Sequence, residues 1–131
     1  MDDLPEDVRR LLREHIVSLE QLEILLFARA RPTQNLEAKT VGDELRTSEA
    51  SAATRLADLE QRGFVIRCQE ESKLCYQYSP NSEWLRAAVD LLEKAYAERR
   101  YRVIELIFSK PIDNLRVYAG AFRFRKDNSD G

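Results

Sequence analysis

Apolar residues recur at helical spacing in two stretches near the start of the chain. A first helix is predicted over Pro5–Glu14, because its valine and leucines fall on one side and proline suits a first turn. A second helix is predicted to begin after Ser18, which forms a capping box with Gln21 three residues later. Pro32 ends this helix, since proline cannot continue the backbone hydrogen bonding.

The segment Thr40–Val65 has the pattern of two short helices joined by a tight turn. Thr40 is predicted to cap the first of them, and Thr47 or Ser48 to cap the longer second one. Gly63 is expected to end the second helix, because glycine readily takes the left-handed conformation found at helix C-termini. A strand is predicted to follow at once.

The longer helix has two unlike faces. The apolar stripe, expected to pack on Val41 and Leu45, consists of Ala52, Leu56 and Leu59. The opposite stripe, expected to face solvent, consists of Ser51, Thr54, Arg55 and Asp58. This division predicts a helix seated on its neighbour with a polar edge directed outward.

Two β-rich runs come next, Phe64–Gln69 and Leu74–Ser79, and they predict a hairpin, the wing of a winged helix. The loop around Leu36 is expected to supply a further short strand. From Ser82 a helical pattern continues for roughly 28 residues, or about 42 Å at the standard helical rise. Its stripe repeats in steps of four and three, interrupted only by Arg99, and predicts a dimerisation helix covered by a second copy.

The pattern therefore predicts a mainly α fold with a small β-hairpin, a winged helix-turn-helix with a long C-terminal dimerisation helix. We expect residues 1–80 to form the winged helix-turn-helix domain with its N-terminal helix. Residues 81–131 are expected to supply the long helix and a terminal helix that begins at Pro111, for dimerisation.

Length and composition fit a single globular domain of 131 residues. No apolar run is long enough to cross a bilayer and the charged N-terminus is unlike a signal peptide, so we expect no membrane association and a cytoplasmic location. The net charge is −2, but residues 99–126 carry eight basic residues against two acidic ones. These basic C-terminal helices are a candidate contact for an acidic protein partner.

The order of helix, turn, helix and hairpin in Thr40–Val65 and the following wing resembles the winged-helix transcriptional regulators of bacteria, MarR-like or PadR-like in layout. The resemblance implies that the second helix enters the DNA major groove and that the wing touches phosphate or the minor groove. The positions that match its DNA-contacting residues are Ser48, Ser51, Thr54 and Arg55 on the helix, and Arg67 and Lys73 on the wing.

Two departures from that family pattern concern charge. Glu49 occupies a position where the family has a basic residue, and Glu70 and Glu71 lie at the wing tip where arginine is common. Phosphate contacts by lysine or arginine supply much of DNA affinity, so this helix is expected to depend on hydroxyl groups, one arginine and a homodimer. The alternative is a winged-helix module that binds a transcription or signalling protein without contacting DNA.

The remaining chemistry is limited. A hairpin that turns at Glu71 and Ser72 places Cys68 opposite Cys75, which is compatible either with a thiol switch or with two small buried side chains in a reducing compartment. The chain has one histidine and no paired metal-ligand spacing, so we expect no metal site. No phosphate-binding loop or nucleophile motif is present, and the sequence predicts neither an enzyme nor a cofactor.

Overall fold

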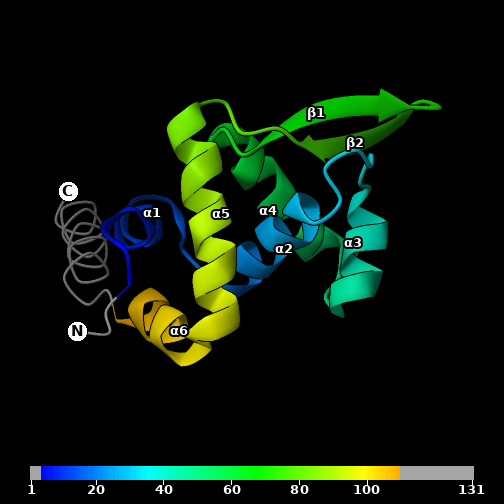
Figure 1. The fold of residues 1–131 in the computed structure, drawn as a ribbon. Helices are drawn as coiled ribbons and strands as arrows, with labels where there is room; N and C mark the ends of the chain where they lie inside the picture. The colour runs from blue at the N-terminus through cyan, green and yellow to red at the C-terminus, as the bar shows by residue number, and fades with distance from the viewer. Residues whose placement is uncertain (1–3, 110–131) are drawn as a thin grey trace, which may run out of the picture.

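The structure, a computed structural model, describes residues 4–109, which form six helices and one hairpin (Figure 1). The elements in chain order are α1 (Glu6–His15), α2 (Leu19–Arg29), α3 (Ala38–Leu45), α4 (Glu49–Gln61), β1 (Val65–Glu70), β2 (Lys73–Tyr78), α5 (Glu83–Glu98) and α6 (Arg100–Phe108). This confirms the predicted class, mainly α with a small hairpin in a winged helix-turn-helix.

The ends of α4 lie where its sequence places them. The Ser48 hydroxyl accepts a hydrogen bond from the Ser51 amide at 3.0 Å, so Ser48 is the N-cap. Gly63 has φ +89° and directs the chain from α4 into β1. The prediction for Thr40 is wrong, because α3 begins at Ala38 and Thr40 lies inside it. The N-cap is Glu37, whose backbone is still extended (φ −95°, ψ 148°) directly after the isolated bridge between Leu36 and Tyr76.

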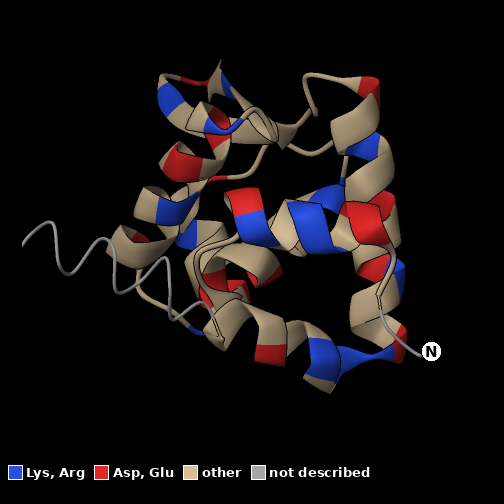
Figure 2. Cartoon of the chain, turned by 90° about the vertical axis from the view of Figure 1, so that its left-hand side faces the viewer, with Lys and Arg blue, Asp and Glu red and all other residues tan. Residues whose placement is uncertain are grey.

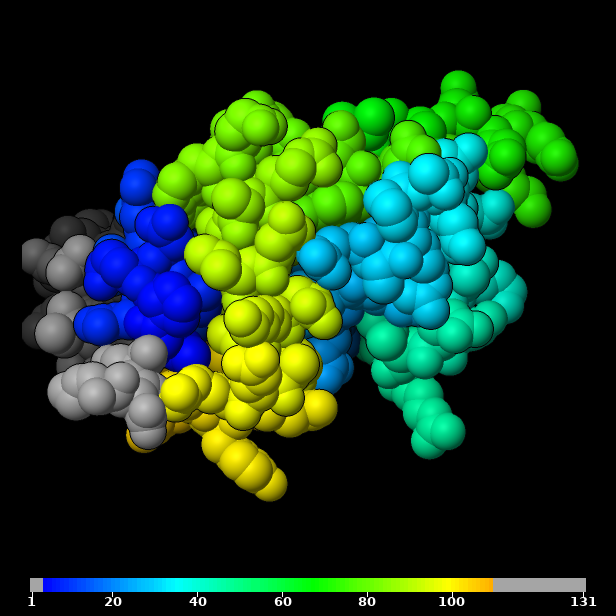
Figure 3. Space-filling model, in the orientation of Figure 1, coloured from blue at the N-terminus to red at the C-terminus, as the bar shows by residue number. Residues whose placement is uncertain are grey.

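The hairpin has the predicted register. β1 and β2 are antiparallel, with Cys68 opposite Cys75 and Glu70 opposite Lys73. Glu71 and Ser72 form the turn with φ values of +52° and +68°, the left-handed conformation at both central positions of a type I′ turn. In Figures 1 and 3 the hairpin projects beyond the helical body, at the end far from α1.

One buried core cluster connects both ends of the described chain. It extends from Leu4 to Ile107 and includes Phe64, a fully buried side chain at the start of the hairpin. α1 packs on α5 and α6, while α4 packs on α2 and α3. The predicted division at residue 80 thus crosses a shared core, although a separate dimerisation role for residues 81–131 stays a prediction.

The single helix predicted from Ser82 is wrong in its length. Its N-cap is Ser82, but the backbone leaves the helical conformation at Arg99, with φ −135° and ψ 53°, which separates α5 from α6. α6 then packs against α1, with Val103 and Ile107 buried. The chain therefore covers much of this apolar stripe itself, since folding back removes the same side chains from water without a second copy.

The predicted terminal helix from Pro111 and most of the basic C-terminal segment lie outside the described residues. Between residues 4 and 109, no helix combines the length and the apolar content that crossing a bilayer requires.

Candidate nucleic-acid interface

The outward face of α4 lies beside the hairpin. Ala50, Ala53 and Thr54 are exposed on this face. A groove of about 430 Å³ lies between α3, α4 and β2, and its lining includes Lys39, Ala53 and Lys73. A helix with small side chains on its exposed face can approach a partner surface closely, and the hairpin offers a second contact alongside it.

Four of the six predicted contact residues are exposed: Arg67 on β1, which pairs with Glu60, and the three described next. Ser48 lies at the start of α4, where its hydroxyl caps the helix. Thr54 donates its hydroxyl to the Ala50 carbonyl at 3.1 Å and so presents mainly its methyl group outward. Lys73 is exposed at the hairpin tip and faces the groove. Lys73 lines the groove together with Glu49 and Ala53 of α4, the helix that carries Ser48 at its start and Thr54 on its exposed face.

Ser51 and Arg55 are placed differently, on the side of α4 that faces the start of α2. Both donate hydrogen bonds to Oε1 of Glu20, Arg55 through Nε at 3.0 Å. Thr47, one turn before Ser51, donates to Oε2 of the same carboxylate at 2.6 Å. Ser51 and Arg55 are half-buried, so the expectation that this stripe faces solvent is wrong for both residues. Because α4 packs on α2, Ser51 and Arg55 bind Glu20 inside the molecule instead of facing solvent.

The three donors around Glu20 stabilise the charged form of its carboxyl group. The hydrogen bonds from Ser51, Thr47 and Arg55, in that order of size, lower the pKa of Glu20 to about 2. The carboxylate is therefore ionised at neutral pH, and it neutralises Arg55 in an ion pair whose side chains are each about 30% exposed, at 30% and 31%.

The same edge of α4 continues into a second polar contact. Gln21 is fully buried and donates to Asp58 at 2.9 Å and to the His15 carbonyl at 3.0 Å. Asp58 also accepts from Arg62 at 2.9 Å. Asp58 is therefore half-buried, again contrary to the expected solvent exposure. The polar edge of α4 is consequently fixed on the α1–α2 junction along most of its length.

Most cations of the helix-turn-helix and hairpin are paired with carboxylates. Besides the two pairs already described, Arg67 pairs with Glu60 at 3.1 Å and Lys39 pairs with Asp43 at 3.1 Å. Arg46 and Lys73 have no ion-pair partner among residues 4–109. Residues 37–78 hold six basic and eight acidic residues, a net charge of −2. Basic and acidic residues also alternate on the side of the molecule where α1 lies (Figure 2).

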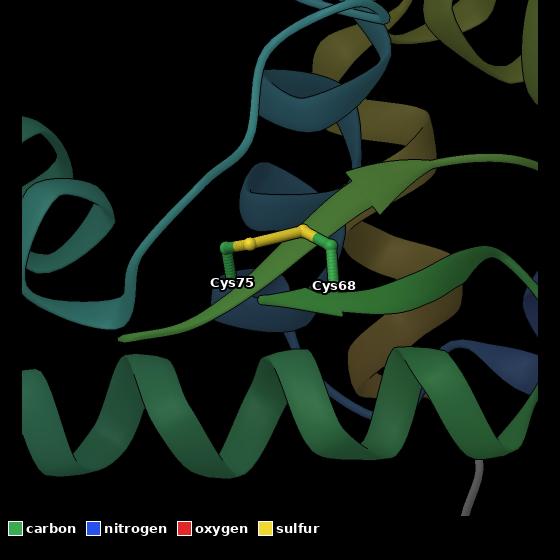
Figure 4. The surroundings of a disulfide bond; sticks show 2 residues. All are labelled: Cys68 and Cys75. Atoms are coloured by element: carbon green, nitrogen blue, oxygen red, sulfur yellow. A yellow bond between two sulfur atoms is a disulfide. The ribbon is translucent and has the colours of Figure 1, made fainter. Parts of the chain in front are cut away.

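The two cysteines are joined across the hairpin. Cys68 of β1 and Cys75 of β2 form a disulfide, with their Cα atoms 4.9 Å apart (Figure 4). Cys75 is buried and Cys68 is half-buried. The bond links the two strands three residue pairs from the turn, and thereby ties the projecting part of the hairpin to its base.

Two residues of this region were not singled out by the sequence. Arg46 takes a left-handed conformation with φ +60° in the turn between α3 and α4 and is exposed there. Glu20 lies 35 positions before Arg55, so only tertiary packing reveals their contact. The four-residue spacing of Ser51 and Arg55 does place these two side chains on one side of α4, which was a usable signal. Across residues 4–109 no group of three His, Cys, Asp or Glu side chains is arranged to hold a metal ion.

Comparison with models of known protein families and with curated protein sequences gives no match. Solved structures do share the fold. A MepR variant of Staphylococcus aureus bound to an oligodeoxyribonucleotide aligns with a TM-score of 0.55 at 12% identity, over 93% of this chain and 87% of that one. HlyU from Vibrio cholerae aligns with a TM-score of 0.54 at 20% identity, over 74% of this chain and 99% of that one.

MepR itself, described as a transcription regulator of the Staphylococcus aureus multidrug efflux pump MepA, aligns with a TM-score of 0.52 at 13% identity. That alignment covers 93% of this chain and 87% of MepR. The fold of this chain is thus the winged helix-turn-helix that MepR, described as a transcription regulator, also has.

Proposed function

We propose that this chain is a DNA-binding transcriptional regulator that acts as a homodimer on a two-fold symmetric site. The observation that carries the proposal is the exposed face of α4 beside the projecting hairpin, in a fold also adopted by a MepR variant that was solved on DNA. In such a dimer two α4 helices would enter successive major grooves about 34 Å apart. A bacterial regulator of this kind would work in the cytoplasm, where the chromosome lies.

The proposed DNA contacts fall into two groups, depending on whether the side chain is already bound to a carboxylate. The first group is exposed and can contact DNA without breaking an ion pair: Ser48, Thr54, Lys73 and, in the turn before α4, Arg46. Three further contacts follow from the resemblance and require release from a carboxylate: Ser51 and Arg55 from Glu20, and Arg67 from Glu60. Thr54 presents a methyl group, which suits contact with the methyl group of thymine.

This charge distribution predicts a modest dependence of binding on salt. Arg46 and Lys73 are the cations without ion-pair partners in the described part of the helix-turn-helix and hairpin, two per protomer and four per dimer. Each phosphate contact contributes about −0.9 to the slope of log K against log salt concentration, so four contacts predict a slope of about −3.6. The affinity for random duplex is expected to be weak at physiological salt.

Fluorescence anisotropy with a random-sequence duplex between 50 and 200 mM salt tests the proposal. Lys73→Gln is expected to reduce the slope by about 0.9 per protomer, because one phosphate contact is lost. Lys94→Gln, an exposed lysine on α5 away from the hairpin, is the charge-matched control and is expected to leave the slope unchanged. If the wild-type chain fails to bind duplex even at the lowest salt, the proposal is wrong.

A second candidate function is a protein-interaction module on the same scaffold. It is favoured by the net charge of −2 over residues 37–78 and by the internal pairing of Arg55, Arg62 and Arg67. Its partner would be a protein of the transcription or signalling machinery, bound through the basic C-terminal helices. Absence of DNA binding together with specific capture of such a protein would support this second function.

A further inference from the structure

We propose that Glu20 is a specificity-determining latch, which holds Arg55 and Ser51 of α4 on α2 and keeps them from DNA phosphates. The inference rests on the proposed DNA-binding function. It assigns a role to a residue outside the helix-turn-helix, and it explains why the one arginine in the middle of α4 does not face outward.

The geometry carries the proposal. Ser51 and Arg55 lie four residues apart on one side of α4, Thr47 lies in the turn just before this helix, and all three donate to the Glu20 carboxylate. Both oxygens of Glu20 are engaged, Oε2 by Thr47 and Oε1 by Ser51 and Arg55. The contact therefore joins the turn before α4 and the first two turns of α4 to one carboxylate, which a single surface ion pair would not do.

The contact removes an arginine from DNA recognition in two ways. Arg55 donates its Nε to Glu20, so its guanidinium must rotate or dissociate before it meets a phosphate along that edge. The ionised Glu20 beside it would also repel an approaching phosphate. The carboxylate thus competes with DNA for the same cation, and the competition weakens binding to any sequence that offers no compensating contacts.

Such competition raises specificity rather than affinity. Contacts to phosphate are the same on every sequence, so withholding one of them lowers non-specific binding most directly. Base-edge contacts from the exposed face of α4, at Ala50, Ala53 and Thr54, are unaffected by the latch. The exposed face of α4 is therefore nearly uncharged, while the cation Arg55 beside it is bound to Glu20 and does not contact phosphate.

The test uses the full chain and random-sequence duplex across 50–200 mM salt. Glu20→Gln removes the competing charge and keeps the side-chain size, so the slope of log K against log salt is expected to steepen by about 0.9 per protomer. Over this range the loss of affinity then grows by about 3.5-fold per protomer. In the double variant Glu20→Gln/Arg55→Gln the steepening is expected to disappear, since its source is Arg55.

Two further variants make the result specific. Glu44→Gln removes an equal charge from an exposed position on α3 that has no ion-pair partner within residues 4–109, so it measures the effect of net charge alone. Arg55→Gln in the wild-type background is expected to leave the slope unchanged, whereas a direct phosphate contact would reduce it by about 0.9. This variant keeps the latch testable if Glu20→Gln does not fold.

The outcomes separate the latch from the function on which it rests. A steeper slope in Glu20→Gln than in Glu44→Gln, lost in the double variant, supports the latch. If Glu20→Gln has the same slope as the wild type, or if Arg55→Gln has a smaller slope than the wild type, the latch is overturned and the DNA-binding function is not. If none of these proteins binds duplex at any salt concentration, the proposed DNA-binding function and the latch are both overturned.

Discussion

Replacing Gly63 with alanine is expected to destabilise the junction between the recognition helix and the hairpin for two separable reasons. Gly63 has φ +89°, and this conformation costs a residue with a Cβ about 1–2 kcal/mol. A Cβ built there would also lie 2.2 Å from Nδ2 and 2.7 Å from Cγ of Asn81. Asn81 is exposed and its side chain can rotate away, so displacing it adds no more than about 1 kcal/mol and the total is about 1–3 kcal/mol.

A double-mutant cycle separates the two contributions. Asn81 is exposed, so Asn81→Ala alone is expected to change stability by less than about 0.5 kcal/mol. In the Asn81→Ala background the steric clash is absent, and Gly63→Ala is expected to cost only about 1–2 kcal/mol. Urea unfolding followed by the fluorescence of Trp84, the single tryptophan, gives the free energies of unfolding.

A Gly63→Ala protein as stable as the wild type would show that the left-handed conformation carries no cost, and would contradict the prediction. An equal cost in both backgrounds would show that Asn81 does not crowd position 63. A loss of helix content in the circular dichroism of Gly63→Ala would identify α4 as the element that yields.

Three further predictions concern the hairpin and the Glu20 contact. The double change Glu71→Asn/Ser72→Gly is expected to raise stability by about 1 kcal/mol, because Asn-Gly tolerates the type I′ turn better, and an unchanged or lower melting temperature would contradict this. Glu20 has a lowered folded-state pKa of about 2, so its stabilisation is present above about pH 4.5 and is lost as the pH falls toward 2. The full pKa shift corresponds to about 3 kcal/mol of folding free energy, which solvent screening reduces to about 1–2 kcal/mol. A difference in unfolding free energy between the wild type and Glu20→Gln that does not shrink in acid would refute this prediction. In protein whose Cys68–Cys75 disulfide has first been reduced, one peroxide is expected to convert the two thiols back into the disulfide and two waters, with slower amide exchange in the hairpin. Two thiols that still titrate after peroxide would exclude a thiol switch.

Local signals in the sequence were sufficient for the helix-turn-helix and the hairpin. Ser18 and Ser48 cap helices through hydrogen bonds to residues only three positions away, so neighbouring residues determine them. Gly63 ends α4 for an equally local reason, its φ of +89°. The hairpin register, with Cys68 opposite Cys75, follows from the length of the turn alone.

Features that depend on tertiary packing were predicted less well. The apolar stripe after Ser82 keeps its spacing across Arg99, so periodicity does not distinguish one long helix from two helices folded against the same core. Arg99 was the one polar residue in that stripe and marks the break. The polar edge of α4 was expected in solvent because serine and arginine usually are exposed, and only the fold brings Glu20 opposite Ser51 and Arg55.

The central proposal is that the outward face of α4 and the tip of the hairpin together meet duplex DNA. Backbone amide NMR of the full chain, titrated with a short duplex at low salt, tests it most directly. The expected result is a set of shifted signals at Ala50, Ala53, Thr54 and Lys73, with α1 and α6 unchanged. Shifts confined to α1 and α6, or no shifts at any duplex concentration, would contradict the proposal.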